Sequence, residues 1–235
     1  PLPENLIEIS KKVVDTKADL GIVVDPDVDR LALVCEDGSI FGEEYTLVSV
    51  ADYVLSKTPG NTVSNLSSTR ALSDVTNKHN GNYFASAVGE VNVVEKMKDK
   101  NAVIGGEGNG GIIYPALHYG RDALVGIALF LTNLAEKEIS CKSLRKTYPN
   151  YFISKNKIDL DLSVDIAKLL KTLESKFSFN NINTIDGLKI NFDDGWVHLR
   201  RSNTEPIIRI YSESVTLDKA NQLAEDFISQ IKELL

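Results

Sequence analysis

Hydrophobic and polar positions in the first two thirds of the chain predict alternating helices and strands. Leu6, Ile9 and Val13 recur at helical spacing, and β-branched residues then predict buried strands over 19–24 and 31–35. Further helices are predicted over 43–55, 70–79, 91–100 and 121–138, and further strands over 62–65, 83–87, 102–105 and 112–114. This alternation is typical of an α/β domain, in which helices cover a parallel or mixed sheet.

The pattern changes after the tract 142–150, where Tyr148-Pro149 indicates a helix end that leads into a linker. Strands are predicted over 151–160, 182–190, 196–199 and 207–212, and helices over 164–177 and 217–235. The turn Asp193-Asp194-Gly195 is expected to join the two middle strands. These elements predict a small α+β domain at the C-terminus.

Composition narrows the class of protein. The 235 residues are 43% hydrophobic and 25% charged, which is the balance of a soluble globular protein. A net charge of −7 disfavours a protein that coats nucleic acid, because phosphate neutralisation needs surplus Lys and Arg. No apolar run is long enough for a membrane span, and Cys35 and Cys141 are too few for a disulfide framework or a zinc site. We therefore expect a cytoplasmic protein with reduced thiols and no membrane or nucleic-acid partner.

Three carboxylates stand at alternate positions between the first two predicted strands, in the run Asp25-Pro26-Asp27-Val28-Asp29-Arg30. Alternate residues of an extended segment point the same way, so Asp25, Asp27 and Asp29 are predicted to converge on one side of a tight loop. Crowded carboxylates are costly unless a cation lies among them, and all-oxygen ligands favour Mg²⁺ or Ca²⁺. We favour a Mg²⁺ site, with Arg30 beside it for a phosphate.

Two alternatives apply to this acidic run. An EF-hand would place Glu36 at its twelfth position, but Arg30 occupies the position where that loop needs glycine, and strands flank the segment. A solvated acidic turn is the ordinary fate of such a loop. Two apolar strands hold this loop in place, which favours the metal site.

A glycine-rich run, Gly106-Glu107-Gly108-Asn109-Gly110-Gly111, follows a predicted strand. It formally contains a dinucleotide-binding pattern, but no helix is predicted at its end, and Glu107 would repel a pyrophosphate. A carboxylate and an amide between glycines suit neutral hydroxyls, because Glu107 can accept from adjacent sugar hydroxyls and Asn109 can donate or accept. The alternative is a flexible hairpin turn.

A third run, Arg200-Arg201-Ser202-Asn203-Thr204-Glu205-Pro206, lies between two predicted strands. The guanidinium of Arg200, the hydroxyls of Ser202 and Thr204, and the amide of Asn203 can all donate to one anion. Arginine is preferred where a phosphate is recognised by two parallel hydrogen bonds. The alternative is an exposed polar turn with a surface ion pair.

Taken in this order, the three runs resemble the α-D-phosphohexomutase family, which includes phosphoglucomutase, phosphomannomutase and phosphoglucosamine mutase. The resemblance covers essentially the whole chain. It implies that residues 1–41 are the end of domain 2, residues 42–146 are the α/β domain 3, and residues 147–235 are the α+β domain 4. Because the chain begins at Pro1 without a methionine, we expect a fragment that lacks the N-terminal domains and their phosphoserine.

The resemblance also implies roles for single residues. Asp25, Asp27 and Asp29 match the Mg²⁺ ligands, and Arg30 matches the arginine beside the phosphoserine. Glu107 and Asn109 match the loop that reads the sugar hydroxyls. The residues that match the loop gripping the non-reacting phosphate are Arg200, Ser202, Asn203 and Thr204.

The implied reaction is an isomerisation. A phosphoryl group moves between O1 and O6 of a hexose phosphate through a hexose bisphosphate, and the fragment alone is expected to be inactive. The chain departs from many members at Asn109 (Ser), Gly111 (His) and Glu90 (a basic or imidazole residue), so the preferred sugar and the general acid and base stay open. A non-catalytic module that binds a phosphosugar or Ca²⁺ is the alternative function.

Overall fold

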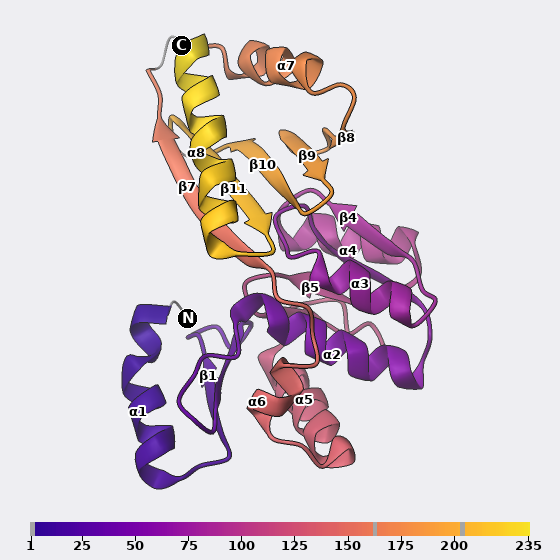
Figure 1. Cartoon of the computed structure of the whole chain (residues 1–235). Helices are drawn as coiled ribbons and strands as arrows, with labels where there is room; N and C mark the ends of the chain where they lie inside the picture. Colours follow the sequence, from indigo (N-terminus) through magenta and orange to yellow (C-terminus); the bar gives the residue numbers. More distant parts are fainter. Residues whose placement is uncertain (1–2, 162–163, 203–204) are drawn as a thin grey trace. The chain divides into compact units, whose positions relative to one another are not determined.

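The computed structural model describes residues 3–161, 164–202 and 205–235, which form two compact units (Figure 1). Unit 1 spans Pro1–Pro149 and unit 2 spans Asn150–Leu235. The three segments expected from the sequence, with boundaries after residues 41 and 146, refer to domains of a longer protein and stay a prediction.

Unit 1 alternates helices and strands, as the hydrophobic pattern predicts. Its helical elements are the 3-10 helix η1 (Pro3–Leu6), α1 (Ile7–Thr16), α2 (Glu43–Lys57), α3 (Ala71–Lys78), α4 (Glu90–Asp99), α5 (Ala123–Lys137) and α6 (Cys141–Arg145). Its strands are β1 (Leu20–Val24), β2 (Leu31–Cys35), β3 (Asn61–Asn65), β4 (Tyr83–Ser86), β5 (Ala102–Glu107) and β6 (Gly111–Ile113).

The strands of unit 1 form two sheets. β1 and β2 make an antiparallel hairpin, and a four-stranded mixed sheet has the order β4-β3-β5-β6. β3 runs parallel to β4 and β5, whereas β6 runs antiparallel to β5. Helix α4 packs on this sheet through Val93 and Met97, which are fully buried against Val63 of β3. Right-handed crossovers between parallel strands then place α3 on the opposite face from α4.

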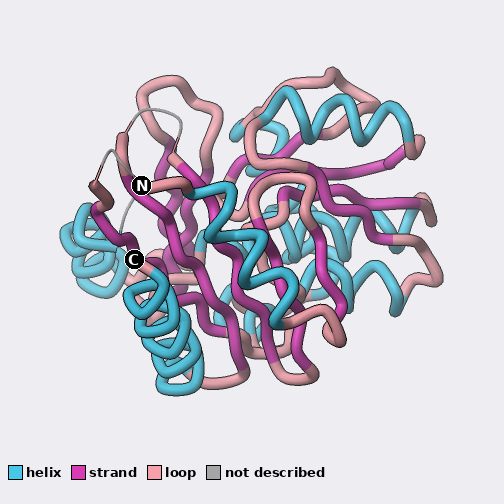
Figure 2. Tube along the Cα trace, turned by 90° about the horizontal axis from the view of Figure 1, so that it is seen from above, coloured by secondary structure: helices cyan, strands magenta, loops and turns pink. Residues whose placement is uncertain are grey.

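Unit 2 is a separate α+β structure. Its elements are β7 (Phe152–Asp159), α7 (Ile166–Lys176), β8 (Asn181–Asn183), β9 (Leu188–Phe192), β10 (Gly195–Arg201), β11 (Ile207–Ser214) and α8 (Leu217–Leu234). The five strands form an antiparallel sheet with the order β7-β11-β10-β9-β8. In Figure 2 the helix that ends at the C label is α8, and it runs alongside strands of this sheet.

The core of unit 2 forms where α7 and α8 cover one face of the sheet. Leu173 of α7 and Phe227 of α8 pack in one cluster with Val197 and Leu199 of β10 and with Ile210 of β11. Val197 and Leu199 are two positions apart on their strand, so they point to the same face. This face accounts for the apolar positions that predicted strands in this part of the chain.

The strand predicted over 182–190 is wrong, because two strands occupy that stretch. β8 and β9 are antiparallel partners, and the turn between them contains Asp186-Gly187. Gly187 has a φ of 78°, which a glycine adopts at little cost. The dipeptide Asp-Gly is a strong hairpin signal. The apolar residues on both sides of it make the stretch resemble one continuous strand, which is why the prediction missed the turn.

The sequence predicts no membrane-spanning segment and two reduced cysteines, and the structure bears on both points. Within the described part of the chain, no helix is long and apolar enough to cross a membrane. Cys35 on β2 and Cys141 on α6 are both buried free thiols.

Candidate functional site

The acidic run between β1 and β2, residues 25–30, is a tight turn, as the expected tight loop implies, but its residues do not alternate as they would in an extended segment. The N–H of Val28 donates to the carbonyl of Asp25 at 3.0 Å, and Val28 has a φ of 57°, which β-branched residues rarely adopt. Oδ1 of Asp25 accepts hydrogen bonds from the backbone N–H groups of Asp29 and Arg30, each at 3.1 Å. This segment, the acidic turn, therefore brings Asp25 and Asp29 together, whereas Asp27 is exposed.

The carboxyl groups of Asp25 and Asp29 interact electrostatically. Partial burial acts to raise the pKa of Asp25, but hydrogen bonds from the backbone N–H groups of Arg30 and Asp29 outweigh it and lower that pKa. Burial and the neighbouring Asp25 raise the pKa of Asp29 against the opposing charge of Arg121. Nε of Arg30 lies 3.6 Å from Oδ2 of Asp25 and 3.7 Å from Oδ1 of Asp29, so a cationic side chain already borders the pair.

The acidic turn has donors that fit a hard cation. Oδ1 of Asp29 is buried and accepts no hydrogen bond, and carboxylate oxygens are the ligands that Mg²⁺ prefers. Across residues 3–161, 164–202 and 205–235, however, no group of three or more His, Cys, Asp or Glu side chains is gathered to hold a metal ion. The assignment of Mg²⁺ to Asp25, Asp27 and Asp29 therefore stays a prediction.

The glycine-rich run forms the tip of the hairpin between β5 and β6. The strand β6 follows it, which agrees with the prediction that no helix begins there. The tip lies directly against the acidic turn, because the N–H of Leu31 donates to the carbonyl of Gly110 at 3.0 Å and Arg30 forms a bridge with Gly111. A Cβ at position 110 would lie 2.3 Å from the carbonyl oxygen of Leu31. Glycine at this position thus permits the close approach of the two loops.

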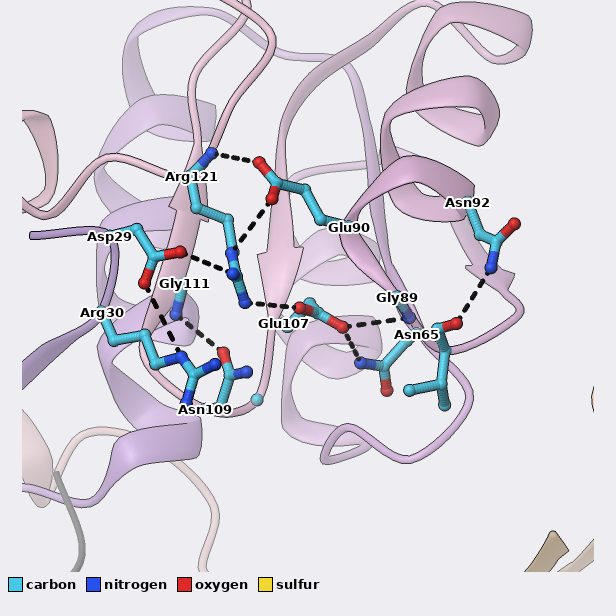
Figure 3. A network of polar contacts seen from close by, with 12 residues as sticks. Asp29, Arg30, Asn65, Gly89, Glu90, Asn92, Glu107, Asn109, Gly111 and Arg121 are labelled. Carbon is cyan, nitrogen blue, oxygen red and sulfur yellow. Dashed lines mark hydrogen bonds and ion pairs between the residues drawn. The ribbon is translucent and has the colours of Figure 1, made fainter. Parts of the chain in front are cut away.

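Glu107 is anchored at the end of β5 (Figure 3). Its side chain is 6% exposed, and Oε1 accepts from Nδ2 of Asn65 at 2.8 Å and from the N–H of Gly89 at 3.2 Å. Oε2 accepts from NH1 of Arg121 at 2.9 Å. These three donors hold the carboxylate in one orientation. Asn109 is partly exposed, and its Oδ1 accepts from the N–H of Gly111 at 3.1 Å.

Sequence reasoning does not assign Asn65, Glu90 or Arg121 to the site. Arg121 precedes α5, and its guanidinium contacts Asp29, Glu90 and Glu107. Its place shortly after the glycine-rich run is the signal that could have pointed to it. Asn65 ends β3 and gives no such signal.

The third predicted run belongs to unit 2, where Arg200 and Arg201 are the last residues of β10 and Pro206 precedes β11. Nε of Arg200 lies 3.0 Å from Oδ2 of Asp186, in the turn that follows β8. Ser202 is buried, and its N–H donates to the carbonyl of Ile207 at 3.0 Å, so the strands on both sides hold the run. Asn203 and Thr204 lie outside the described residues.

Comparisons with known proteins agree on one family. Residues 42–151 match the model for phosphoglucomutase/phosphomannomutase, alpha/beta/alpha domain III, and residues 155–230 match the model for the C-terminal domain of that family. A probable phosphoglucosamine mutase from Methanopyrus kandleri is 31% identical over 235 residues, which cover 99% of this chain and 52% of that protein.

Solved structures share the fold. The crystal structure of a phosphoglucomutase/phosphomannomutase family protein from Burkholderia thailandensis matches 99% of this chain and 50% of its own, with 27% identity and a TM-score of 0.84. An N-acetylphosphoglucosamine mutase from Aspergillus fumigatus, crystallised with GlcNAc-6P and magnesium, matches 89% of this chain and 51% of its own, with 14% identity and a TM-score of 0.66. The chain thus spans about half the length of the relatives it matches.

Proposed function

Because this chain belongs to the phosphoglucomutase/phosphomannomutase family, we propose that it is part of a phosphohexomutase that interconverts hexose 1-phosphates and hexose 6-phosphates. The phosphoryl group moves between O1 and O6, and a hexose bisphosphate is the intermediate. The three runs of this chain supply the metal, sugar and distal-phosphate contacts, whereas the phosphoserine comes from N-terminal domains of the same protein. A cytoplasmic location is part of the proposal, since both cysteines are free thiols.

One observation supports this proposal: the acidic turn and the carboxylate of Glu107 lie in a single hydrogen-bonded network. Arg121 contacts Oδ2 of Asp29 at 2.5 Å and Oε2 of Glu107 at 2.9 Å, although the sequence separates these acids widely. A mutase needs its charge-neutralising group next to its hydroxyl reader, because phosphoryl transfer depends on positioning and electrostatic stabilisation. A Ca²⁺-binding module has no need of this coupling.

The proposed roles follow from the chemistry of each side chain. Asp25, Asp27 and Asp29 would hold Mg²⁺, which when bound offsets negative charge on phosphoryl oxygens. Arg30 borders the same carboxylates and supplies positive charge for a phosphate. The fixed carboxylate of Glu107 accepts from sugar hydroxyls, and Asn109 assists at the loop tip. Arg200, Ser202, Asn203 and Thr204 grip the phosphate that does not react.

An activity assay on two lengths of the protein tests the proposal. The chain extended by its N-terminal domains should convert glucose, mannose or glucosamine 1-phosphate into the 6-phosphate, as followed by ³¹P NMR with Mg²⁺ and a trace of hexose bisphosphate. Residues 1–235 alone should show no turnover under the same conditions. Turnover by residues 1–235, or failure of the longer protein on every sugar phosphate, would count against the proposal.

Arg200 offers a test of the phosphate contact. In the longer protein, Arg200→Ala should raise the KM for the sugar phosphate by about 10- to 100-fold, because it removes a charge-assisted contact worth about 1.5–3 kcal/mol. Initial rates at varied substrate concentration measure this change. Lys219→Ala on α8 removes a cation that is 58% exposed and pairs with Asp194, so it serves as the control and should change KM less than threefold. Equal KM values for the wild type and Arg200→Ala would show that this run is only a turn.

A further inference from the structure

One guanidinium joins three carboxylates that come from three separate segments of unit 1. NH2 of Arg121 lies 2.5 Å from Oδ2 of Asp29 in the acidic turn, and NH1 lies 2.9 Å from Oε2 of Glu107 at the end of β5. Nε lies 3.4 Å from Oε2 of Glu90 at the start of α4. Figure 3 shows the Arg121 side chain lying between these three acids. The side chain is only 13% exposed, so water screens these charges weakly.

The backbone around Arg121 is held by the same segments. Its own N–H donates to Oε1 of Glu90 at 2.8 Å, and the N–H of Asp122 donates to the carbonyl of Ile112 in β6 at 2.9 Å. The N–H of Ala123 donates to the carbonyl of Val28 in the acidic turn at 3.1 Å. The start of α5 is therefore attached to both loops through main-chain hydrogen bonds as well as through the side chain of Arg121.

The glycine-rich run leaves room for this side chain. A Cβ at position 111 would lie 2.5 Å from Cδ of Arg121, which is closer than real atoms approach. The stem of Arg121 thus lies across Gly111, and a residue larger than glycine there would push the guanidinium away from Asp29 and Glu107. The absence of a side chain at Gly111 therefore makes room for the stem of Arg121.

Only arginine can make this set of contacts. Its planar fork presents donors on several edges, so one side chain can face three acids at once, whereas a lysine ammonium is a compact point charge on a flexible stem. Without a cation between them, Asp29, Glu90 and Glu107 would repel one another and move apart. Arg121 contacts Oδ2 of Asp29, whereas Oδ1 of Asp29 is buried, accepts no hydrogen bond and lies 3.7 Å from Nε of Arg30.

We propose that Arg121 is a positioning residue that holds the acidic turn and the carboxylate of Glu107 at a fixed separation. It acts through Asp29 and Glu107 and not on the sugar phosphate itself. The inference rests on the proposed function. It adds that the guanidinium of Arg121 aligns two parts of the substrate: the reacting phosphate at the acidic turn and the sugar hydroxyls at Glu107.

The kinetic test uses the longer protein with its N-terminal domains. Arg121→Ala should lower kcat by about 30- to 100-fold, because a displacement of about 1 Å in a catalytic group costs up to about 100-fold. KM for the sugar phosphate should change less than about threefold, since other residues bind the distal phosphate. Arg121→Lys should stay within about threefold of Arg121→Ala, because lysine restores the charge and not the fork. Millimolar guanidinium ion should restore part of the kcat of Arg121→Ala, and ammonium ion should not.

Controls separate this role from general stability and from failure of the proposed function. Lys57→Ala removes an exposed cation that pairs with Glu136, and it should leave kcat unchanged. Wild-type kcat in Arg121→Lys, or a loss in Arg121→Ala that guanidinium and ammonium ions rescue equally, would overturn the inference. An inactive wild type would instead reject the proposed function. In that case crystal structures of the wild type and of Arg121→Ala test the inference, because no activity is needed for them. Unchanged positions of Asp29 and Glu107 in Arg121→Ala would overturn it.

Discussion

Asp29→Asn in the longer protein is expected to lower kcat by about 1000-fold, which corresponds to about 4 kcal/mol of lost transition-state stabilisation. Asparagine has nearly the same shape as aspartate, but it carries no negative charge and only one acceptor oxygen. Oδ2 of Asp29 faces Arg121, and Oδ1 is the buried oxygen that accepts no hydrogen bond. The substitution therefore removes the charge that we assign to the cation and weakens the contact that fixes the acidic turn.

The measurement is the initial rate over a range of Mg²⁺ concentrations. Asp37→Asn is the matched control, because Asp37 lies in the turn after β2 and pairs with Lys142 at the protein surface. The control should keep its rate within about twofold of the wild type, as surface ion pairs contribute little. If Asp29→Asn keeps more than a tenth of the wild-type kcat at saturating Mg²⁺, the assignment of Asp29 is wrong.

Asp52→Asn is expected to destabilise unit 1 by about 2–3 kcal/mol at pH 7. Asp52 lies on α2 with its side chain 5% exposed, and it contacts groups from three other segments. Oδ1 lies 2.8 Å from Nε2 of His79, and Oδ2 lies 2.9 Å from Nζ of Lys137. The hydroxyl of Tyr148 donates to Oδ2 at 3.2 Å. The substitution leaves Lys137 without its opposite charge, and it replaces one acceptor oxygen of this cluster by an NH2 donor.

The effect should depend on pH with a definite sign. Burial acts to raise the pKa of Asp52, but the hydrogen bonds from His79 and Lys137 outweigh it and lower that pKa from 3.8 to about 2. A lowered folded-state pKa stabilises the native state above pH 3.8, and this contribution is lost as the pH falls through about 2. The difference in unfolding free energy between wild type and Asp52→Asn should therefore shrink between pH 4 and pH 2.

Urea unfolding at pH 7, 4 and 2.5 measures this difference. Far-UV circular dichroism follows the whole chain, whereas Trp196, the single tryptophan, lies in β10 and reports on unit 2. Asp99→Asn on α4 is the control, because that side chain is 59% exposed and its loss should cost less than about 0.5 kcal/mol. A difference that stays constant down to pH 2.5 would contradict the assigned role of Asp52.

Much of the fold could be predicted because it depends on local patterns. The alternation of helices and strands in unit 1 follows from the side-chain periodicities of each element, and the structure confirms it. The family resemblance is likewise confirmed, since the runs that carry it are contiguous in the chain. A local error arises where a short turn lies between apolar residues, because the strand predicted over 182–190 includes the turn Asp186-Gly187.

The sequence alone determined which chemical groups this protein carries and which neighbours along the chain each of them has. Only the tertiary structure decided which of these groups meet. Asp29 and Arg121 are 92 positions apart, and Asn65 and Glu107 are 42 apart, so no periodicity could pair them. Such contacts arise when the hairpin tip, the acidic turn and the start of α5 pack together, and that packing depends on the shape and burial of the whole of unit 1.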